Sequence, residues 1–150
     1  MTIKNIKHAL AYVTEILERK GFRILYTIPA NYNRNYIIKV RINATGYTFY
    51  LIYQREPFHS FKKYFGIDEP ALGIQLDFLR LIHGRGVERI LWVLGDGSIY
   101  MGKTKEIYKN AVEKQWILKT EKTGELVVNY PISLLESVGV ETHLGFTSMP

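Results

Sequence analysis

The sequence predicts a single α/β domain over residues 1–150, in which a mixed β-sheet is flanked by helices. Helical and strand-like hydrophobic patterns alternate along the chain, in the order helix, three strands, helix, two strands, helix, strand, helix. The length of 150 residues and the 47% hydrophobic content are typical of one domain. The 12 glycines and 5 prolines are dispersed, so no stretch has the composition of a linker.

The most regular helical pattern opens the chain. Apolar residues recur every three or four positions from Ile3 to Leu17, and Gly21 is a typical C-terminal stop. The next stretch, FRILYTI, is β-branched and aromatic, which predicts a strand over residues 22–28 that ends before Pro29.

A hairpin of two strands follows, Tyr36–Ile42 and Tyr47–Arg55. In the first strand Lys39 and Arg41 alternate with apolar side chains, so we expect both cations on the face away from the core. In the second strand, alternation assigns three side chains to a polar face: Thr48, Tyr50 and Gln54. The hairpin is therefore predicted to present a cationic, hydrogen-bonding and partly aromatic surface.

The second half of the chain is predicted to hold the remaining elements. Two acidic residues before Pro70 are typical of a helix start, and that helix is expected to run to about His83. The wholly apolar stretch Ile90–Leu94 is typical of a central strand covered on both faces. Thr104 is expected to cap a further helix, and the chain then gives a strand that Pro131 stops and a short final helix.

The net charge of +6 is distributed unevenly. Residues 1–66 hold 11 Lys and Arg against 3 acidic residues, whereas residues 67–150 hold 9 against 11. Between Arg19 and Arg55 there is no Asp or Glu, and the first half also carries 8 of the 11 tyrosines. Basic side chains replace counterions on phosphates and aromatic rings stack on unpaired bases, so this half predicts nucleic-acid binding. The alternative is a solvated basic face above a tyrosine-rich core.

The candidate nucleic-acid-binding residues lie in this basic half. Phosphate contacts are assigned to six cations: Arg34, Lys39, Arg41, Arg55, Lys62 and Lys63. Rings and hydrogen bonds are assigned to Tyr32, Tyr36, Tyr50 and Gln54. No helix carries the clustered Arg, Asn and Gln of a major-groove reader, so we expect binding that depends on structure or on charge, to DNA rather than RNA.

Several classes of site are excluded by composition. The chain has no cysteine, which rules out disulfides and thiolate metal sites.

The N-terminal stretch lacks the unbroken apolar run of a signal peptide or membrane span, so we expect a cytoplasmic protein with no membrane partner. The composition is also compatible with a thermophilic source. The 4 histidines share no metal-ligand spacing, and His59 is the one candidate for a metal-free RNase mechanism.

The order of elements from Ile3 to Gly102 resembles the core of the restriction-endonuclease-like, or PD-(D/E)XK, nucleases. Archaeal Holliday-junction resolvases and small archaeal viral nucleases are similar in size. The resemblance implies Mg²⁺ or Mn²⁺ as cofactor, held by an acid at the start of one hairpin strand and by an acid-x-lysine on the next, and it implies a homodimer. In this sequence the first position is Asn35 or its neighbour, and the second falls at Leu51, Ile52 and Tyr53, so both acids are missing.

Three hypotheses of function follow. The leading one is a nucleic-acid-binding protein with a nuclease-like fold, either catalytically degenerate or with relocated acids. The second is an active endonuclease in which Glu15 and Glu56 hold the divalent metal. The alternatives are that Glu15 pairs with Arg19 and that Glu56 is a loop charge paired with a lysine; Asp77, a third candidate carboxylate, is expected to be a plain surface charge. The third is a protein-interaction module in which residues 47–65 pack against a partner subunit.

Overall fold

The computed structural model describes residues 1–30, 34–59 and 69–139. Within these ranges the elements are α1 (Ile6–Arg19), β1 (Arg23–Ala30), β2 (Asn35–Ile42), β3 (Thr45–Gln54), β4 (Ala71–Gln75), α3 (Leu76–Gly84), β5 (Arg89–Leu94), β6 (Ile99–Lys103), α4 (Thr104–Lys114), β7 (Ile117–Lys119), β8 (Leu126–Pro131), a 3₁₀ turn (Ile132–Leu134) and β9 (Glu136–Ser137).

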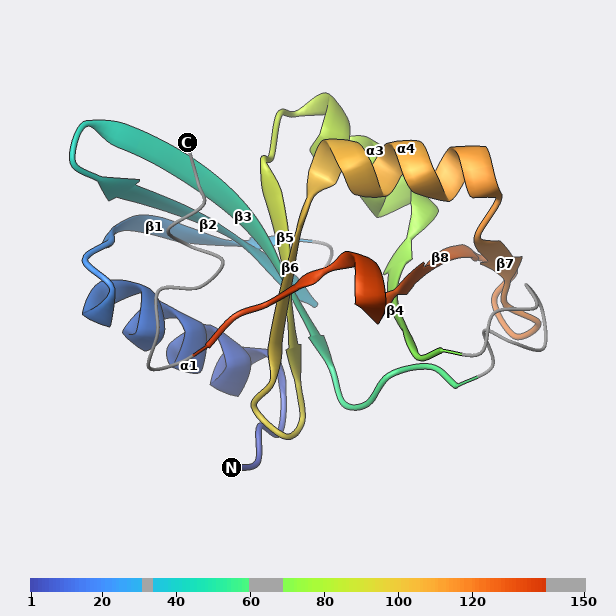
Figure 1. Ribbon diagram of the computed structural model, residues 1–150, viewed down its shortest axis with the longest axis horizontal. Coiled ribbons are helices and arrows are strands. Elements are labelled where there is room, and N and C mark those ends of the chain that lie inside the picture. Colours follow the sequence, from blue (N-terminus) through green and yellow to red (C-terminus); the bar gives the residue numbers. More distant parts are fainter. Residues whose placement is uncertain (31–33, 60–68, 140–150) are drawn as a thin grey trace.

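The larger sheet has the strand order β1-β2-β3-β5-β6-β9 and is mixed, because β3 and β5 run parallel while the other neighbours are antiparallel. A smaller antiparallel sheet has the order β4-β8-β7. Figure 1 shows α1 on one side of the larger sheet, with the smaller sheet, α3 and α4 on the other side. This arrangement confirms the predicted α/β fold class with a mixed sheet flanked by helices.

The larger sheet separates two hydrophobic cores. On one face, α1 packs Val13 and Leu17 against Ile38 and Phe49 of the hairpin. On the other face the smaller sheet, α3 and α4 cover β3, β5 and β6. Every residue of β5 is buried, as expected for a central strand.

Two side chains of the larger sheet tie it to the smaller one through the backbone of a single residue. Trp92, which is 0% exposed, donates its Nε1 hydrogen to the Gly73 carbonyl at 2.9 Å. The Gly73 N–H donates to Gln54 Oε1, also at 2.9 Å. A Cβ built on Gly73 would lie 2.4 Å from a ring carbon of Phe58, so any larger residue would displace this ring.

The edge strand β1 contains a bulge that changes which of its residues share a face. The register shifts between Ile24, opposite Val40, and Tyr26, opposite Lys39. Tyr26 therefore points to the same side of the sheet as Lys39, whereas regular alternation would place it with Ile24 beneath α1. The strand also continues through Pro29 because an edge strand tolerates a missing N–H.

Two predicted helices and one predicted helix cap are wrong. The helix expected from Pro70 to His83 is a strand, β4, followed by the shorter helix α3, because β4 pairs with the distant β8. The final helix is only a 3₁₀ turn before β9. Thr104 is not the cap of α4, since Lys103 holds that position and Thr104 is the first helical residue.

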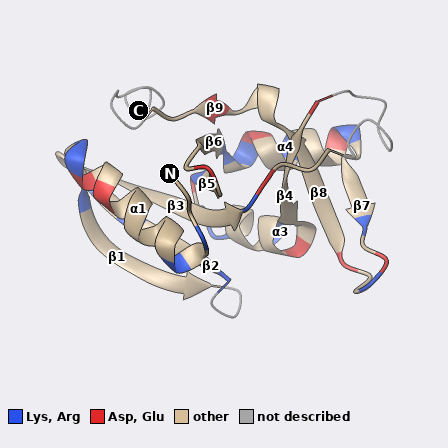
Figure 2. Cartoon of the chain, turned by 90° about the horizontal axis from the view of Figure 1, so that it is seen from below, with Lys and Arg blue, Asp and Glu red and all other residues tan. Residues whose placement is uncertain are grey.

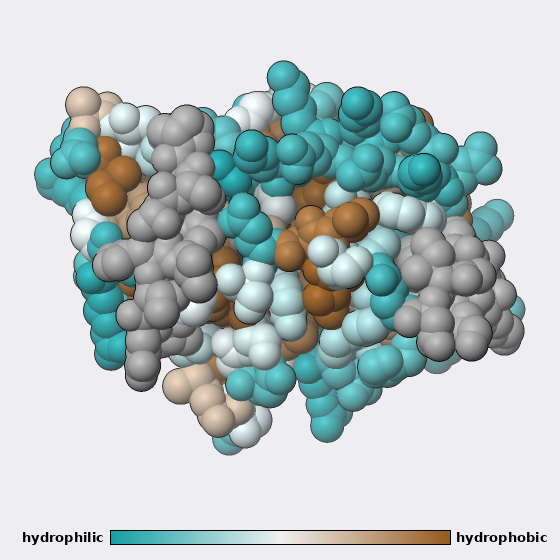
Figure 3. Space-filling view, viewed as in Figure 1, coloured by the Kyte–Doolittle hydropathy of each residue, from teal (hydrophilic) through white to brown (hydrophobic). Residues whose placement is uncertain are grey.

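None of the described helices is long and apolar enough to cross a membrane. In the space-filling view of Figure 3, hydrophilic residues cover the upper part of the molecule and hydrophobic residues gather near the centre of the same face. The exposed apolar side chains of the chain include Val112 (44% exposed) and Leu134 (53% exposed).

Candidate nucleic-acid interface

Four side chains of β1 and β2 lie together on a part of the larger sheet that none of the described helices covers. Arg23 is directly opposite Arg41, and Tyr26 is directly opposite Lys39. Directly opposed residues point to the same side of a sheet, and these four point away from α1. Arg23, Arg41 and Tyr26 are exposed, and Lys39 is half-buried. We call this set, Arg23, Tyr26, Lys39 and Arg41, the hairpin face.

The cations of the hairpin face are not neutralised by the rest of the described chain. Arg23, Lys39 and Arg41 form no ion pair and no side-chain hydrogen bond with any residue in the described ranges. β1 and β2 contain no Asp or Glu, and the acidic residues nearest to β1 in Figure 2 lie on α1. Exposed cations that share a face and lack carboxylate partners are suited to contact phosphates.

Glu88 is the carboxylate that approaches this region from the neighbouring part of the fold. Its Oε2 accepts a hydrogen bond from the Thr48 N–H at 3.1 Å, and its own N–H donates to Thr48 Oγ1 at 3.2 Å. Thr48 is the partner of Lys39 in the β2–β3 register. The carboxylate is thus bonded to the backbone of β3 rather than to a cation of the hairpin face.

The sequence pattern identified Lys39 and Arg41 but missed Arg23 and Tyr26. Tyr26 is 45% exposed and supplies the ring that the surface was expected to carry. The bulge at residue 25 places it there, and an extra residue in one strand leaves no mark in hydrophobic alternation.

The rings predicted from β2 and β3 are in the core. Tyr50 is 0% exposed, and its hydroxyl accepts a hydrogen bond from Asn35 Nδ2 at 2.8 Å. Tyr36 is 9% exposed and belongs to the core beneath α1. The prediction that these tyrosines stack on bases is wrong, because the smaller sheet covers one ring and α1 covers the other.

The other residues predicted to contact nucleic acid lie apart from one another or form hydrogen bonds within the protein. Both ends of the Gln54 amide are engaged, since its Nε2 donates to the Glu56 carbonyl at 2.9 Å and its Oε1 accepts from the Gly73 N–H. Arg34 and Arg55 are exposed, but they line two different cavities. Lys62, Lys63 and Tyr32 lie outside the described residues, as do the predicted neighbours of His59.

The positions that the resemblance assigns to metal-binding acids meet in a cavity of about 270 Å³, which we call the Asn35 cavity. Asn35 and Ile52 line it, together with Arg34, Gly73 and Gln75, and its lining residues include no carboxylate. Mg²⁺ and Mn²⁺ take oxygen ligands, mainly carboxylates. An amide that donates to Tyr50 and an aliphatic side chain do not supply them, so the residues present do not fit a catalytic divalent ion.

The proposed substitute acids do not join the Asn35 cavity. Glu15 is exposed on α1, on the opposite side of the sheet, and pairs with Arg19. Glu56 lines a separate cavity of about 530 Å³ together with Asp96. Asp77 is exposed, with its carboxylate 4.0 Å from Arg80. Among the described residues, no group of three or more His, Asp or Glu side chains could hold a metal ion.

Asp96 has a pKa below the ordinary value of an Asp carboxyl, mainly because it accepts a hydrogen bond from the Ser98 N–H at 2.9 Å. A lowered pKa in the folded state stabilises the fold above the unfolded pKa, and this contribution is lost as the pH falls through the folded pKa. We expect Asp96→Asn to be less stable than the parent at neutral pH, with a gap that narrows below about pH 3.9. Urea denaturation of the parent and the variant at neutral pH and below about pH 3.9 measures the difference in their stability. An equal difference at the two pH values would contradict a lowered pKa of Asp96 in the folded state.

The hypothesis of a partner-packing segment at residues 47–65 finds little surface in the described part of that segment. Tyr47, Phe49 and Leu51 are 7%, 0% and 0% exposed and pack against α1. Phe58 is 38% exposed, but it covers Gly73. Tyr47, Phe49 and Leu51 therefore belong to the protein's own core.

No family model and no curated protein matches this chain. The structure is similar to that of D212, a nuclease from a fusselovirus, with a TM-score of 0.50 over 87% of this chain and 80% of that one. The two sequences are 12% identical over the match, so the similarity concerns the fold alone. The chain therefore shares the α/β fold of that nuclease.

Proposed function

We propose that this protein binds nucleic acid through the hairpin face, as one nuclease-like domain, without metal-dependent hydrolysis at the Asn35 cavity. The observation that carries the proposal is the gathering of Arg23, Lys39 and Arg41 on an open sheet face without ion pairs to the described residues. The nuclease-like fold supports nucleic acid as the class of ligand.

The geometry of the hairpin face favours contacts to the backbone of the nucleic acid. Lys39 and Arg41 are two positions apart on one strand and therefore about 7 Å apart. Arg23 extends the row of charge across to the edge strand, and Tyr26 adds a ring on which a base can stack. Such contacts are made to phosphates and to base faces, which all sequences share, so binding is expected to be largely independent of sequence.

The absence of hydrolysis follows from the donor set of the Asn35 cavity. Metal-assisted cleavage needs carboxylates that concentrate the divalent ion, and the side chains that line the cavity are amide, aliphatic and aromatic, together with the cation of Arg34. The proposal also includes a cytoplasmic location, which the N-terminal sequence supports, and DNA rather than RNA as ligand and a homodimer, which the sequence resemblance supports. The DNA and RNA arms of the test separate the two ligands.

The test is a fluorescence-anisotropy titration with single-stranded, duplex and branched DNA and with RNA, over a range of salt. We expect log affinity to fall linearly with log salt, with a slope of about −2 to −3 for three phosphate contacts. The same mixtures with Mg²⁺ or Mn²⁺ should give no cleavage product on a gel. Lack of binding at low salt would refute the proposed function, and a metal-dependent product that Glu15→Ala/Glu56→Ala abolishes would establish the endonuclease hypothesis instead.

A further inference from the structure

A second cationic surface lies where β3 extends beyond β5. The first pair between these strands is Phe49 with Arg89, so the hairpin end of β3 has no strand beside it on that edge. A cavity of about 640 Å³ lies there, bounded by the hairpin turn, by the loop before β5 and by the start of α4. We call it the α4 notch.

The strongest sign of a ligand in the α4 notch is Arg89. This residue lines the cavity and is only 5% exposed. Its side chain forms no ion pair and no hydrogen bond with any described residue. Thr104, which is 2% exposed, lines the same cavity, and its Oγ1 is a buried side-chain oxygen without a hydrogen-bond partner among the described residues. A cation and a buried hydroxyl at one cavity call for a counter-charge and a hydrogen bond. An anion in the cavity would supply both.

The N-terminus of α4 opens on the same cavity. The helix has 11 residues and its N-cap, Lys103, makes no side-chain capping bond. The Thr104 N–H donates to the Glu88 carbonyl at 3.0 Å, but no described residue accepts from the N–H groups of Lys105 and Glu106 outside the helix. Uncapped N–H groups and the positive end of the helix dipole favour an anion at this place.

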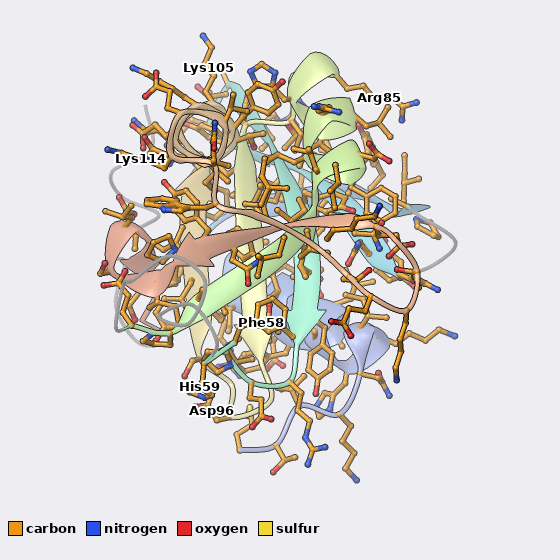
Figure 4. The ribbon with its side chains drawn as sticks, turned by 90° about the vertical axis from the view of Figure 1, so that its right-hand side faces the viewer. Phe58, His59, Arg85, Asp96, Lys105 and Lys114 are labelled. Carbon is orange, nitrogen blue, oxygen red and sulfur yellow. The ribbon has the colours of Figure 1, made fainter. Side chains whose placement is uncertain are left out.

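The side chains around the α4 notch have an excess of positive charge. Arg89, Lys103 and Lys105 line it, against Glu88, whose carboxylate is bonded to Thr48. Figure 4 shows Lys105 and Arg85 on two sides of the upper end of the molecule, with Asp96 toward its lower end. The first-turn acid Glu106 is not among the lining residues; its charge acts on Tyr130, whose pKa is raised mainly by burial.

The α4 notch adjoins the hairpin face through Lys39. A Cβ built on Gly46, which lines the notch, would lie 3.1 Å from Lys39 Nζ, so this ammonium group lies over the rim. A nucleic-acid strand that follows the hairpin face therefore reaches the notch at its end.

We propose that the α4 notch binds the terminal phosphate of a nucleic-acid strand held on the hairpin face, an inference that rests on the proposed function. A terminal phosphate carries a charge of about −1.5 to −2 at neutral pH, more than the single charge of an internal phosphodiester. The charge of a terminal phosphate is therefore suited to contact Arg89, the two lysines and the N-terminus of α4 together. Free inorganic phosphate has the same chemistry and is the other source that the test separates.

The test compares oligonucleotides with a terminal phosphate at either end and the same oligonucleotides with hydroxyl ends. We expect one phosphorylated form to bind at least about tenfold more tightly than the hydroxyl form. Lys103→Gln/Lys105→Gln should remove this preference and leave the affinity for the hydroxyl form nearly unchanged. Lys114→Gln/Lys119→Gln, which changes exposed lysines at the other end of α4 and on β7, is the matched control and should keep the preference.

Two further readouts separate this inference from the proposed function. Titration of the protein alone with inorganic phosphate should shift the amide NMR signals of Lys105 and Glu106, even in a hairpin-face variant that no longer binds oligonucleotides. Absence of these shifts, equal affinity for phosphate and hydroxyl ends, or a preference that survives Lys103→Gln/Lys105→Gln would each overturn the inference. Failure of the hydroxyl form to bind would instead count against the hairpin face.

Discussion

Lys39→Glu/Arg41→Glu is expected to abolish nucleic-acid binding at moderate salt. The double substitution replaces two of the three cations on the hairpin face with carboxylates, which repel phosphates. Loss of two phosphate contacts alone makes the negative slope of log affinity against log salt shallower by about two. Anisotropy titrations of the parent and the variant at several salt concentrations measure both effects.

The control for this experiment must change the net charge equally at another place. Lys114→Glu/Lys119→Glu does so on exposed residues of α4 and near it, away from the hairpin face. We expect this variant to retain most of the affinity and most of the salt slope. Equal losses in the two variants would mean that binding follows total charge and that the hairpin face has no special role.

Trp92→Ala is expected to cause the largest loss of stability that a single substitution in the described core would give. Trp92 is fully buried between the larger sheet and the smaller one, so its removal leaves a cavity in that core. Truncation of a buried Trp costs about 3–5 kcal/mol, and loss of the bond to the Gly73 carbonyl is part of that cost. Urea denaturation followed by circular dichroism measures the free energy of unfolding.

Trp92→Phe separates the packing of Trp92 from its hydrogen bond. The phenyl ring fills most of the space but leaves the Gly73 carbonyl without the indole N–H, which we expect to cost about 1–3 kcal/mol. If Trp92→Ala costs no more than Trp92→Phe, the packing between the two sheets contributes little and the account of this core is wrong.

The elements that depend on local pattern were predictable from the sequence. The amphipathic helix α1, the hairpin of β2 and β3 and the wholly apolar β5 all have a clear period. The strand β4 was assigned to a helix because its apolar residues fit either period, and its partner β8 is more than 50 residues away. The secondary structure of such a stretch depends on which distant segment it pairs with, and a local sequence pattern holds no information about that pairing.

The candidate site was predicted in part, for the same reason. Alternation along β2 placed Lys39 and Arg41 on one face, and the structure places them there. Alternation along β3 placed Tyr50 on that face too, but the smaller sheet covers this position, and the sequence does not show that a second sheet packs there. Arg89 and the start of α4 come together only through the fold, because their sequence neighbours are those of an ordinary strand and helix.

The most direct test of nucleic-acid binding at the hairpin face is an amide NMR titration of the protein with a short single-stranded oligonucleotide at low salt. The account expects the largest chemical-shift changes at Arg23, Tyr26, Lys39 and Arg41, with little change along the exposed side of α1. Changes confined to α1, or no changes at oligonucleotide concentrations that saturate the anisotropy signal, would contradict it.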